Sequence, residues 1–462
     1  MASRQGGTLS GFTPLSTPNA PTDLSVSTSI GSASVSFTAP TDTGDGAVTS
    51  FIVTAIDEST GASAGATGSA SPITVSPGGG TFKIRAQAVN GFGPGRLTEF
   101  STGNAVFSGA ELYAWGYNTK GSIGDNTTVS RSSPIQVGAL SNWAKVSSGG
   151  GTSAAITTAG SLYLWGANPF GQIGDGTTVY KSSPVQIGAL TNWSQVSVGS
   201  NQTVSLKTDG TMWAWGFNNA GRLGDGTVIN KSSPVQIGAL TTWYQASTGN
   251  GHTVAVKTDG TLWAWGSNGS GPLGTGNTIS YSSPVQIGAL TNWSQVAAGN
   301  GNTMAVKTDA TLWGWGYNGK GKLGDGTVVN KSSPIQIGAL TNWSQVATGQ
   351  SHTACVKTDG TLFTWGNYVA GRLGLNDSVS RSSPTQVGGL TDWARVSTTS
   401  ESSHNIALKT DRTMWTWGYN GFGRLGDNTT ANRSSPIQVG ALSDWVEVAA
   451  GFGPTLALLG VV

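Results

Sequence analysis

The sequence predicts an all-β protein in which a seven-bladed β-propeller follows an N-terminal β-sandwich. The first observation is a unit of about 50 residues that recurs seven times from Leu112 to the C-terminus. A period of this length is typical of propellers, solenoids and other repeat architectures. The second observation is composition: charged residues make up only 10% of the 462 residues, whereas glycine occupies 70 positions. Such a composition favours many short strands joined by tight turns.

Two tryptophans mark every repeat. The first stands in a Trp-Gly pair, at Trp115, Trp165, Trp215, Trp265, Trp315, Trp365 and Trp417. The second stands near the end of the repeat, at Trp143, Trp193, Trp243, Trp293, Trp343, Trp393 and Trp445. A core between packed sheets requires large apolar side chains at regular positions in every blade. We therefore expect the first set to be structural, with side chains buried between neighbouring blades.

Each repeat contains four predicted strands. In one repeat, residues 203–215 predict a hairpin, because Asp209 and Gly210 stand between two runs of strand-forming residues. Residues 234–237 predict a third strand and residues 243–247 a fourth. Seven such units predict a propeller of seven four-stranded blades.

The two ends of the repeat region predict how the ring closes. The first unit begins at its Trp-Gly strand, Leu112 to Trp115, and lacks the strand that precedes this one elsewhere. A surplus strand near the C-terminus, Thr455 to Leu459, matches the missing one. We expect these two strands to pair, so that the C-terminal strand closes a propeller formed by residues 105–462.

The residues before the repeats predict a separate domain. Residues 21–104 hold short runs of alternating apolar and polar side chains between Gly, Pro and Asp, which predicts a small β-sandwich. Residues 1–20 are rich in Gly, Ser, Thr and Pro, and we expect them to form an extended N-terminal arm. The sandwich resembles a fibronectin type III domain in the runs Val35-Ser36-Phe37 and Phe51-Ile52-Val53 and in the segment from Phe82 to Asn90. Phe82 stands where that family has its corner tyrosine, so the hydroxyl bond of the corner is missing.

The repeats resemble the regulator of chromosome condensation family. The motif is His-Thr before an aliphatic strand and then Trp-Gly-x-Asn-x-x-Gly-x-Leu-Gly. It stands here as His252-Thr253-Val254 and as the run from Trp265 to Gly274. The resemblance covers about three quarters of the chain and implies a propeller. The family includes a nucleotide exchange factor for a small GTPase, bacterial β-lactamase inhibitors and phage proteins, so the resemblance alone implies no function.

One repeat position is a candidate metal site. Its seven occupants are Thr152, Gln202, His252, Asn302, His352, His404 and Pro454. Equivalent positions in a propeller lie on one circle, so a ring of histidine ligands is one interpretation. The other occupants are poor ligands, and we expect instead polar side chains that bridge neighbouring blades. A single aspartate in each Leu-Gly-Asp loop is also a poor calcium site and favours a turn. We therefore predict neither a metal nor a cofactor.

Several classes of function find no support in the sequence. Glutamate occurs only five times, and no nucleophile has a matching histidine and acid partner, so no catalytic residue is predicted. The Gly-x-Gly strings lie between strands and lack the helix N-terminus that phosphate binding needs. A net charge of +2 without a basic run does not indicate nucleic-acid binding. The sequence also lacks a run of 18 apolar residues and an apolar leader, so neither membrane insertion nor a secretory signal is expected.

The repeats differ most in the residue that follows Trp-Gly. This residue is Ala167, Ser267 or Asn367 in three repeats, so the blade core does not require an aromatic side chain there. The loops that carry it lie on one side of a propeller disc, and exposed aromatic side chains are typical interface anchors. We therefore predict a binding surface formed by Tyr117, Phe217, Tyr317 and Tyr419.

Together these features favour a non-enzymatic structural or attachment protein of a bacteriophage virion, in a capsid decoration, collar or tail fibre. This expectation rests on resemblance, since phages commonly join immunoglobulin-like modules to repeat domains. The N-terminal arm would bind other virion proteins, and the propeller would bind a protein or a host surface glycan. The alternative is a secreted bacterial adhesin or enzyme inhibitor, located outside the cell. A GTPase exchange factor is disfavoured, because no blade carries a long insertion that could act as a wedge.

Overall fold

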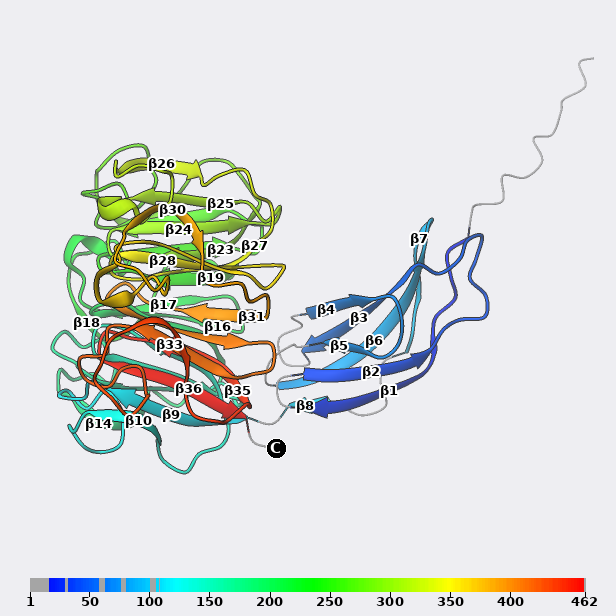
Figure 1. Cartoon of the computed structure of the whole chain (residues 1–462), viewed down its shortest axis with the longest axis horizontal. Coiled ribbons are helices and arrows are strands. Elements are labelled where there is room, and N and C mark those ends of the chain that lie inside the picture. The colour runs from blue at the N-terminus through cyan, green and yellow to red at the C-terminus, as the bar shows by residue number, and fades with distance from the viewer. Residues whose placement is uncertain are drawn as a thin grey trace, which may run out of the picture. The chain divides into compact units, whose positions relative to one another are not determined.

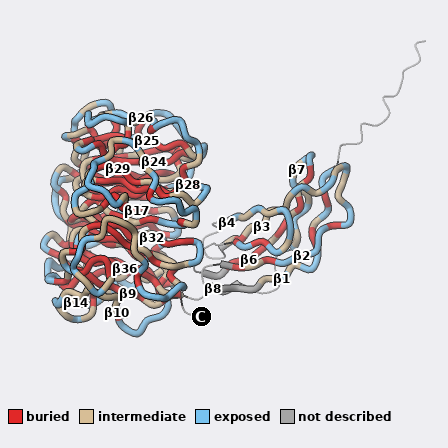
Figure 2. The backbone as a smooth tube through the Cα atoms, viewed as in Figure 1, coloured by how far each residue is buried: buried red, intermediate tan, exposed pale blue. Residues whose placement is uncertain are grey.

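The computed structural model describes residues 16–29, 32–57, 63–75, 80–99, 105–107 and 109–460. These residues form two compact units that divide between residues 108 and 109 (Figure 1). Buried residues are concentrated in the strands, and exposed residues in the connecting loops (Figure 2). The helices of the described ranges are three short 3-10 turns, Asn219–Gly221, Gly319–Gly321 and Val369–Gly371, and none is long enough to cross a membrane.

The N-terminal unit consists of two antiparallel sheets. The first contains β1 (Thr22–Ser29), β2 (Ser32–Thr38) and β5 (Ile73–Val75). The second contains β3 (Ser50–Asp57), β4 (Ser63–Gly68), β6 (Gly80–Asn90), β7 (Gly93–Leu97) and β8 (Ala105–Phe107).

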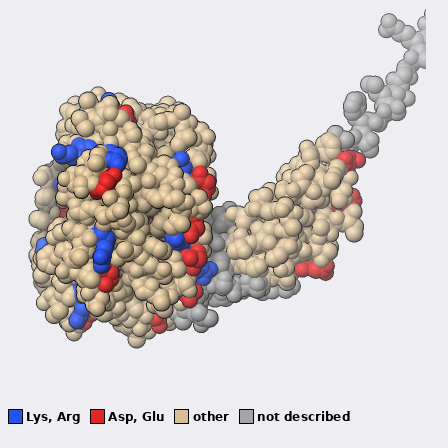
Figure 3. All heavy atoms as spheres, in the orientation of Figure 1, with Lys and Arg blue, Asp and Glu red and all other residues tan. Residues whose placement is uncertain are grey.

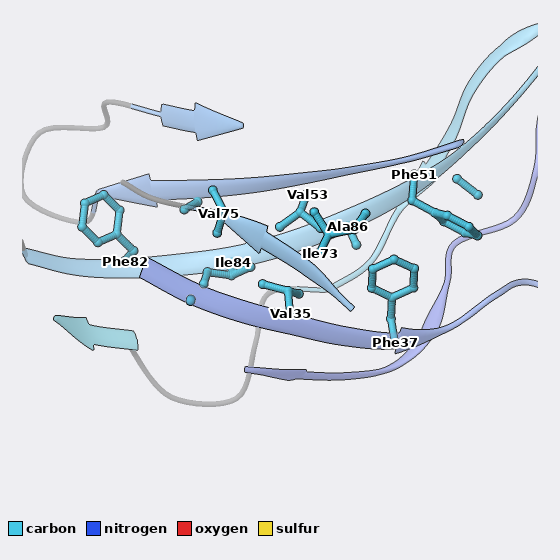
Figure 4. Close-up of a cluster of buried hydrophobic side chains, with 12 residues drawn as sticks. Val35, Phe37, Phe51, Val53, Ile73, Val75, Phe82, Ile84 and Ala86 are labelled. Atoms are coloured by element: carbon cyan, nitrogen blue, oxygen red, sulfur yellow. The ribbon is translucent and has the colours of Figure 1, made fainter. Parts of the chain in front are cut away.

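Side chains from both sheets form one hydrophobic core. Val35 and Phe37 of β2 point toward Phe51 of β3 and Ile84 of β6 (Figure 4). The rings of Phe37 and Phe51 lie 4.9 Å apart and are tilted. Alternate residues of these strands are buried, as the period of two in a β-strand requires.

The ends of the N-terminal unit differ from the predicted boundaries. Residues 1–15 of the predicted arm lie outside the described residues, but Ser16 to Ala20 belong to the folded unit. The carbonyl of Ser16 accepts a hydrogen bond from the Asp45 amide at 3.1 Å, and that of Pro18 accepts one from Arg96 at 3.1 Å. A side chain on Gly95 would collide with Pro18, so glycine is required at this contact. At the other end, β8 pairs with β6, whereas the sequence placed residues 105–107 in the propeller.

In the described residues from 109 to 460, the strands form seven four-stranded antiparallel sets, which are the blades. The first, innermost strands are β11 (Trp143–Ser148), β15 (Trp193–Val198), β19 (Trp243–Thr248), β23 (Trp293–Ala298), β27 (Trp343–Thr348), β31 (Trp393–Ser397) and β35 (Trp445–Ala450). The second strands are β12 (Thr152–Thr157), β16 (Gln202–Lys207), β20 (His252–Lys257), β24 (Asn302–Lys307), β28 (His352–Lys357), β32 (His404–Lys409) and β36 (Pro454–Gly460).

The outer half of each blade holds the Trp-Gly and Ser-Ser-Pro strands. The third strands are β9 (Ala110–Gly116), β13 (Leu162–Gly166), β17 (Met212–Gly216), β21 (Leu262–Gly266), β25 (Leu312–Gly316), β29 (Leu362–Gly366) and β33 (Met414–Gly418). The fourth strands are β10 (Arg131–Gln136), β14 (Lys181–Gln186), β18 (Lys231–Gln236), β22 (Tyr281–Gln286), β26 (Lys331–Gln336), β30 (Arg381–Gln386) and β34 (Arg433–Gln438).

The blades are offset by one strand from the repeats predicted by the sequence. The strand that starts at Trp243 was expected to end the repeat of Trp215, but β19 pairs with β20 and so begins the next blade. We number as blade 1 the sheet β35-β36-β9-β10, and as blades 2 to 7 the sheets that follow along the chain. Blade 1 therefore combines two C-terminal strands with two strands from the start of the repeats.

Strand β36 joins the two ends of the repeat region. It pairs with β9 over its whole length, from Pro454 opposite Gly116 to Gly460 opposite Ala110. Its other edge pairs with β35, so β36 is central in its sheet. Leu456, Ala457 and Leu458 are completely buried.

A tryptophan, a glycine and a carbonyl group join each blade to the next. Trp165 is completely buried, and its indole N–H donates to the Ser122 carbonyl of the preceding blade at 2.9 Å. The same carbonyl accepts a bond from the Ser153 hydroxyl at 2.7 Å. Gly124 lies flat against the Trp165 ring with a φ of +88°, leaving no room for a side chain. All seven tryptophans predicted to be structural are completely buried, and the indole bond recurs at Trp115, Trp165, Trp215, Trp315, Trp365 and Trp417.

Side chains also connect the free edges of the innermost strands. The Gln195 side-chain carbonyl accepts a bond from the Ala246 amide of the next blade at 3.0 Å. Two residues along, Ser197 accepts one from the Thr248 amide at 3.0 Å. Gln245, Gln295 and Gln345 repeat the first contact, and Ser147, Ser247 and Ser397 the second. Edge N–H groups that would otherwise lack a partner are satisfied in this way.

Deleting the chain from Gly453 onward should open the propeller. The deletion removes the central strand of blade 1 and exposes the apolar side chains that pack on it. We expect the melting temperature to fall by roughly 10 °C or more, since each buried aliphatic side chain contributes about 1.5–3 kcal/mol. Thermal unfolding followed by circular dichroism tests this, and an unchanged melting temperature would contradict the role of β36.

Candidate functional site

The loops between third and fourth strands and those between first and second strands emerge at the same end of each blade. The Phe217 amide, for example, donates to the Asn201 carbonyl at 2.8 Å. We call this side of the disc the loop face, and the side with the strand 2–3 hairpins the hairpin face. The predicted aromatic residues all lie in loops of the loop face.

A buried asparagine holds six of the seven long loops in shape, whereas blade 6 carries Tyr368 at this position. Asn218 is completely buried, and its amide group donates to Asp225 at 3.0 Å and to the carbonyl groups of Thr227 and Ile229 at 3.1 Å. Its side-chain oxygen accepts a bond from the Leu223 amide at 2.9 Å. Equivalent bonds occur at Asn118, Asn168, Asn268, Asn318 and Asn420.

The aspartates of these loops already have partners. Desolvation acts to raise the pKa of Asp225, but bonds from Thr227 and Asn218 and the charge of Lys231 lower it overall. Lys231 lies 3.4 Å from the carboxylate, and similar pairs recur in other blades. Basic and acidic side chains are correspondingly interspersed around the visible side of the propeller (Figure 3). The basic residues before Ser-Ser-Pro are therefore largely neutralised by aspartates of their own loops.

The four predicted aromatic side chains are less free than the sequence suggested. Only Tyr317 is exposed, with 44% of its surface accessible, whereas Tyr117, Phe217 and Tyr419 are half-buried. The ring of Tyr117 lies 4.5 Å from that of Phe422 in the preceding blade. Phe217 lies 4.4 Å from Phe170 in the same way. Tyr117 and Phe217 thus contact the loop of the neighbouring blade as well as solvent, and they are not isolated anchors.

Four cations beneath this aromatic layer were missed in the sequence analysis. They are Arg222, Lys322, Arg372 and Arg424, with exposed fractions of 8, 1, 6 and 4%. All occupy the variable position of Gly-x-Leu-Gly, where the other blades carry Ser122, Gln172 and Pro272. This variation between blades could have marked the position as a candidate functional site in the sequence, because the flanking residues hardly change.

The cations contact aromatic rings and backbone carbonyl groups. The charged ends of Arg222, Lys322 and Arg424 lie 4.6–5.0 Å from the ring of the residue after Trp-Gly in their own blade. Arg222 also donates to the Asn250 carbonyl at 2.7 Å, and Arg424 to the Phe452 carbonyl at 2.8 Å. Without a counter-charge, such contacts recover only part of the solvation free energy that a cation loses on burial.

None of the four cations forms an ion pair within the described part of the chain. Burial lowers the pKa of Arg222 to about 10 and that of Lys322 to about 7. Arg222 therefore stays charged at neutral pH, whereas Lys322 is protonated in only part of the molecules. The loop face consequently carries buried positive charge that no carboxylate of the described residues neutralises.

The candidate metal position holds buried histidines that bridge blades. His252 lies 3.0 Å from the Thr303 hydroxyl, His352 lies 2.8 Å from the Asn405 side-chain oxygen, and His404 lies 2.8 Å from the Thr455 hydroxyl. Burial lowers the pKa of all three to about 3, so they are neutral at physiological pH. Within the described ranges, no three possible ligands converge on a metal position.

The innermost strands of all seven blades surround a cavity of about 230 Å³. Hydroxyl groups from Ser147, Ser197 and Ser247 line it, together with the Arg395–Glu447 ion pair. The loop that carries the two extra residues of the longest repeat reaches across the loop-face end. There Glu401 of blade 7 accepts a bond from Asn250 of blade 4 at 3.3 Å.

These features define a repeat propeller with one face of variable loops, and comparison with known proteins identifies its family. Models of the regulator of chromosome condensation (RCC1) repeat match residues 110–156, 159–206 and 193–222, and a model of the RCC1-like domain matches residues 229–457. The repeats of this chain therefore belong to the RCC1 repeat family, and the predicted propeller fold is confirmed. A search of curated proteins gave no match.

Solved structures show the same fold at low sequence identity. Human WBSCR16 is 21% identical, with a TM-score of 0.67, over 76% of this chain and 99% of that chain. Yeast RCC1 (Prp20), in its structure bound to Kap60, is 17% identical, with a TM-score of 0.69, over 77% of this chain and 90% of that chain. Prp20p from Saccharomyces cerevisiae, in a second structure, is 18% identical, with a TM-score of 0.67, over 77% and 92%. All three cover the propeller's share of the chain, and at these identities the likeness shows the fold alone.

The buried histidines should make stability depend on pH. Their folded pKa is depressed from 6.5, so the unfolded chain binds protons that the folded chain excludes. The free energy of unfolding is therefore unaffected by these histidines above about pH 6.5. Below that pH it falls by about 1.4 kcal/mol per histidine for each pH unit. We expect a lower melting temperature at pH 5 than at pH 7. The aspartates, with pKa values lowered below 3.8, do not titrate in this window.

The matched variant is H252N/H352N/H404N, because Asn302 occupies the same position in blade 5. Its melting temperature should change less between pH 7 and pH 5 than that of the wild type. Equal changes in both proteins would show that the histidines are not the titrating groups.

Proposed function

We propose that the chain is a non-enzymatic binding protein that presents the loop face of its propeller to a partner macromolecule. The observation that supports this most strongly is where the blades differ. The asparagine, glycine and tryptophan positions that hold the loops recur with few exceptions, whereas the residue after Trp-Gly and the variable residue of Gly-x-Leu-Gly change from blade to blade. Variable loop residues on a rigid scaffold are typical of recognition surfaces.

The aromatic and basic composition of this face supports a protein or glycan partner. Tyr317, Phe422 and Phe452 are each more than 40% exposed, and arginines lie directly beneath the aromatic layer. Tyrosine, phenylalanine and arginine are enriched at protein interfaces, and tryptophan, tyrosine and arginine dominate binding hot spots. Yeast Prp20 was solved bound to Kap60, and its binding to Gsp1p and histones has been characterised. At 17–18% identity these partners are not carried over to this chain.

We further propose that the binding protein is a structural or attachment component of a bacteriophage virion. In this proposal the N-terminal unit is a fibronectin type III-like spacer, the arm before it binds other virion proteins, and the seven-bladed propeller faces a virion protein or a host glycan. A secreted bacterial adhesin or enzyme inhibitor is the alternative. Mass spectrometry of purified particles separates them, because only the first requires the protein in virions.

Changing Tyr117, Phe217, Tyr317 and Tyr419 together to serine should weaken partner binding. Ser267 shows that serine is compatible with this position. Each interface aromatic contributes about 1–3 kcal/mol when truncated, so we expect a loss of at least 100-fold in affinity. Binding to intact particles or host cells is measured beside a thermal melt. A loss of binding that merely follows a loss of folding would contradict direct contact.

Removing residues 1–15 should abolish incorporation into particles while both folded units remain intact. The deletion stops before Ser16, because Ser16 and Pro18 form hydrogen bonds within the N-terminal unit. Particle incorporation is measured by immunoblot, with unchanged circular dichroism as the control. Normal incorporation of the shortened protein would place the anchor elsewhere.

A further inference from the structure

The loop face is not uniform, and its most distinctive part lies between blades 7 and 1. Five residues meet there, and we call them the seam: Tyr117, Tyr419, Phe422, Arg424 and Phe452. The charged end of Arg424 lies 5.0 Å from the Tyr419 ring, 5.1 Å from Phe422, and 5.7 Å from both Tyr117 and Phe452. One guanidinium group is therefore surrounded by four aromatic rings.

The seam combines a buried charge with exposed apolar surface. Arg424 is 4% exposed, whereas Phe422 and Phe452 are 45% and 42% exposed. An exposed phenylalanine gains little from packing within the protein, so these two rings offer their surface to a partner. The Phe422 ring also lies 4.5 Å from the half-buried Tyr117 ring, and this contact links the loops of blades 7 and 1.

Arg424 retains unused hydrogen-bonding capacity. Its Nε donates to the Phe452 carbonyl at 2.8 Å, but its Nη1 is buried and has no hydrogen-bond partner among the described residues. Leaving a buried donor unpaired costs about 1–3 kcal/mol, and more when the group is charged. Burial lowers the pKa of Arg424, whereas the charge of Tyr419 and a side-chain hydrogen bond with it act in the opposite direction.

The aspartates of the two flanking loops do not pair with Arg424, because each already has a partner in its own loop. Asp125 forms an ion pair with Arg131 at 2.8 Å, and Asp427 forms one with Arg433 at 2.6 Å. Both aspartates are also held by hydrogen bonds from Thr127 and Thr429 in their own loops. Neither aspartate is therefore free to pair with Arg424, and the two flanking loops supply it with no counter-charge.

Arg222 occupies the same position in blade 3, and its Nε and Nη1 both have hydrogen-bond partners. It is 8% exposed and lies 4.6 Å from the Phe217 ring, much like Arg424. Its Nη1, however, donates to the Asn250 carbonyl at 2.7 Å, and its Nε donates to the Asn219 carbonyl at 3.1 Å. The two arginines thus share position, burial and aromatic contact, and differ in the unpaired nitrogen.

We propose that the seam binds a carboxylate of an acidic peptide segment in the partner, with an apolar side chain of the same segment packed on Phe422 and Phe452. This inference rests on the proposed binding role of the loop face. The carboxylate accepts hydrogen bonds from the Arg424 guanidinium, whose planar group matches its two oxygens. Because Arg424 is 4% exposed and its Nη1 is buried, this binding requires the surrounding aromatic rings to move aside.

The surroundings favour a carboxylate over a phosphate group. A single guanidinium among aromatic rings can balance one negative charge. A phosphate monoester carries nearly two, and its desolvation in this apolar environment would require further cations. Arg372 and Lys322 belong to other blades, and neither contacts a ring of the seam among the described contacts.

The test uses the full chain and three blocked peptides. The probe is acetyl-Leu-Asp-Leu-Asp-amide, its neutral counterpart replaces both Asp by Asn, and the third replaces both by phosphoserine. The protein variants are R424Q and R424K, which the scaffold should accept because Gln172 and Lys322 occupy the equivalent position in other blades. R222Q is the matched control. Binding is measured by isothermal titration calorimetry, and folding by thermal melts.

We expect the aspartyl peptide to bind the wild type and R222Q equally, to bind R424Q at least 10-fold more weakly, and to bind R424K more weakly than the wild type. The Asn peptide should bind none of them. The proposal is overturned if R424Q binds as well as the wild type, if the Asn peptide binds equally, or if the phosphoserine peptide binds 10-fold more tightly. Failure of the aspartyl peptide to bind the wild type also overturns it. That result leaves the proposed function standing if the serine variant of the four aromatic residues still loses its natural partner.

Discussion

The contact between the Gly-x-Leu-Gly loop of one blade and the tryptophan of the next is the interaction on which the propeller depends. Each blade carries apolar side chains on both faces of its sheet, so it cannot bury them without the neighbouring blades. The loop carbonyl accepts bonds from an indole N–H and a hydroxyl group of the neighbour, as at Ser122. The glycine beside it lets the ring approach to van der Waals distance. Because the contact recurs from blade to blade, the loss of one blade's packing destabilises the whole ring. For the same reason, β36 is needed to complete the sheet of blade 1.

The same contact explains why the loop face can vary. The structural part of the variable residue in Gly-x-Leu-Gly is its carbonyl group, which every residue type supplies. Serine, glutamine, arginine, proline and lysine all occur there, and the indole bond forms with each of these residue types. The exception among the seven tryptophans is Trp265, whose indole N–H is buried without a partner among the described residues. The residue after Trp-Gly is similarly held through its amide, as in the bond from Phe217 to Asn201. At these two positions the scaffold contacts use main-chain atoms, so the side chains are free to differ between blades.

Local sequence patterns were sufficient to predict the propeller and the burial of its tryptophans, but not the assignment of strands to blades. A period fixes spacing and leaves the starting point open, so the strand of Trp243 could end one repeat or begin the next. Only pairing between distant residues decides this, as it does for β8 and for Ser16 to Ala20. The buried cations were hidden for a related reason. A lysine or arginine in a glycine-rich loop is ordinarily solvated, and Arg222 is buried by the inner loop of the following blade, far along the chain.

The cost of those cations bears on function. Burying a cation against carbonyl groups and aromatic rings without a carboxylate sacrifices solvation that the contacts only partly restore, and the lowered pKa of Lys322 to about 7 reflects that loss. The blade does not require a cation at this position for stability, because Ser122 and Pro272 make the same loop contact without a charge. In the proposed binding role, acceptor groups of a partner would offset this cost. Arg424 is the clearest instance among the cations, because its buried Nη1 has no hydrogen-bond partner among the described residues.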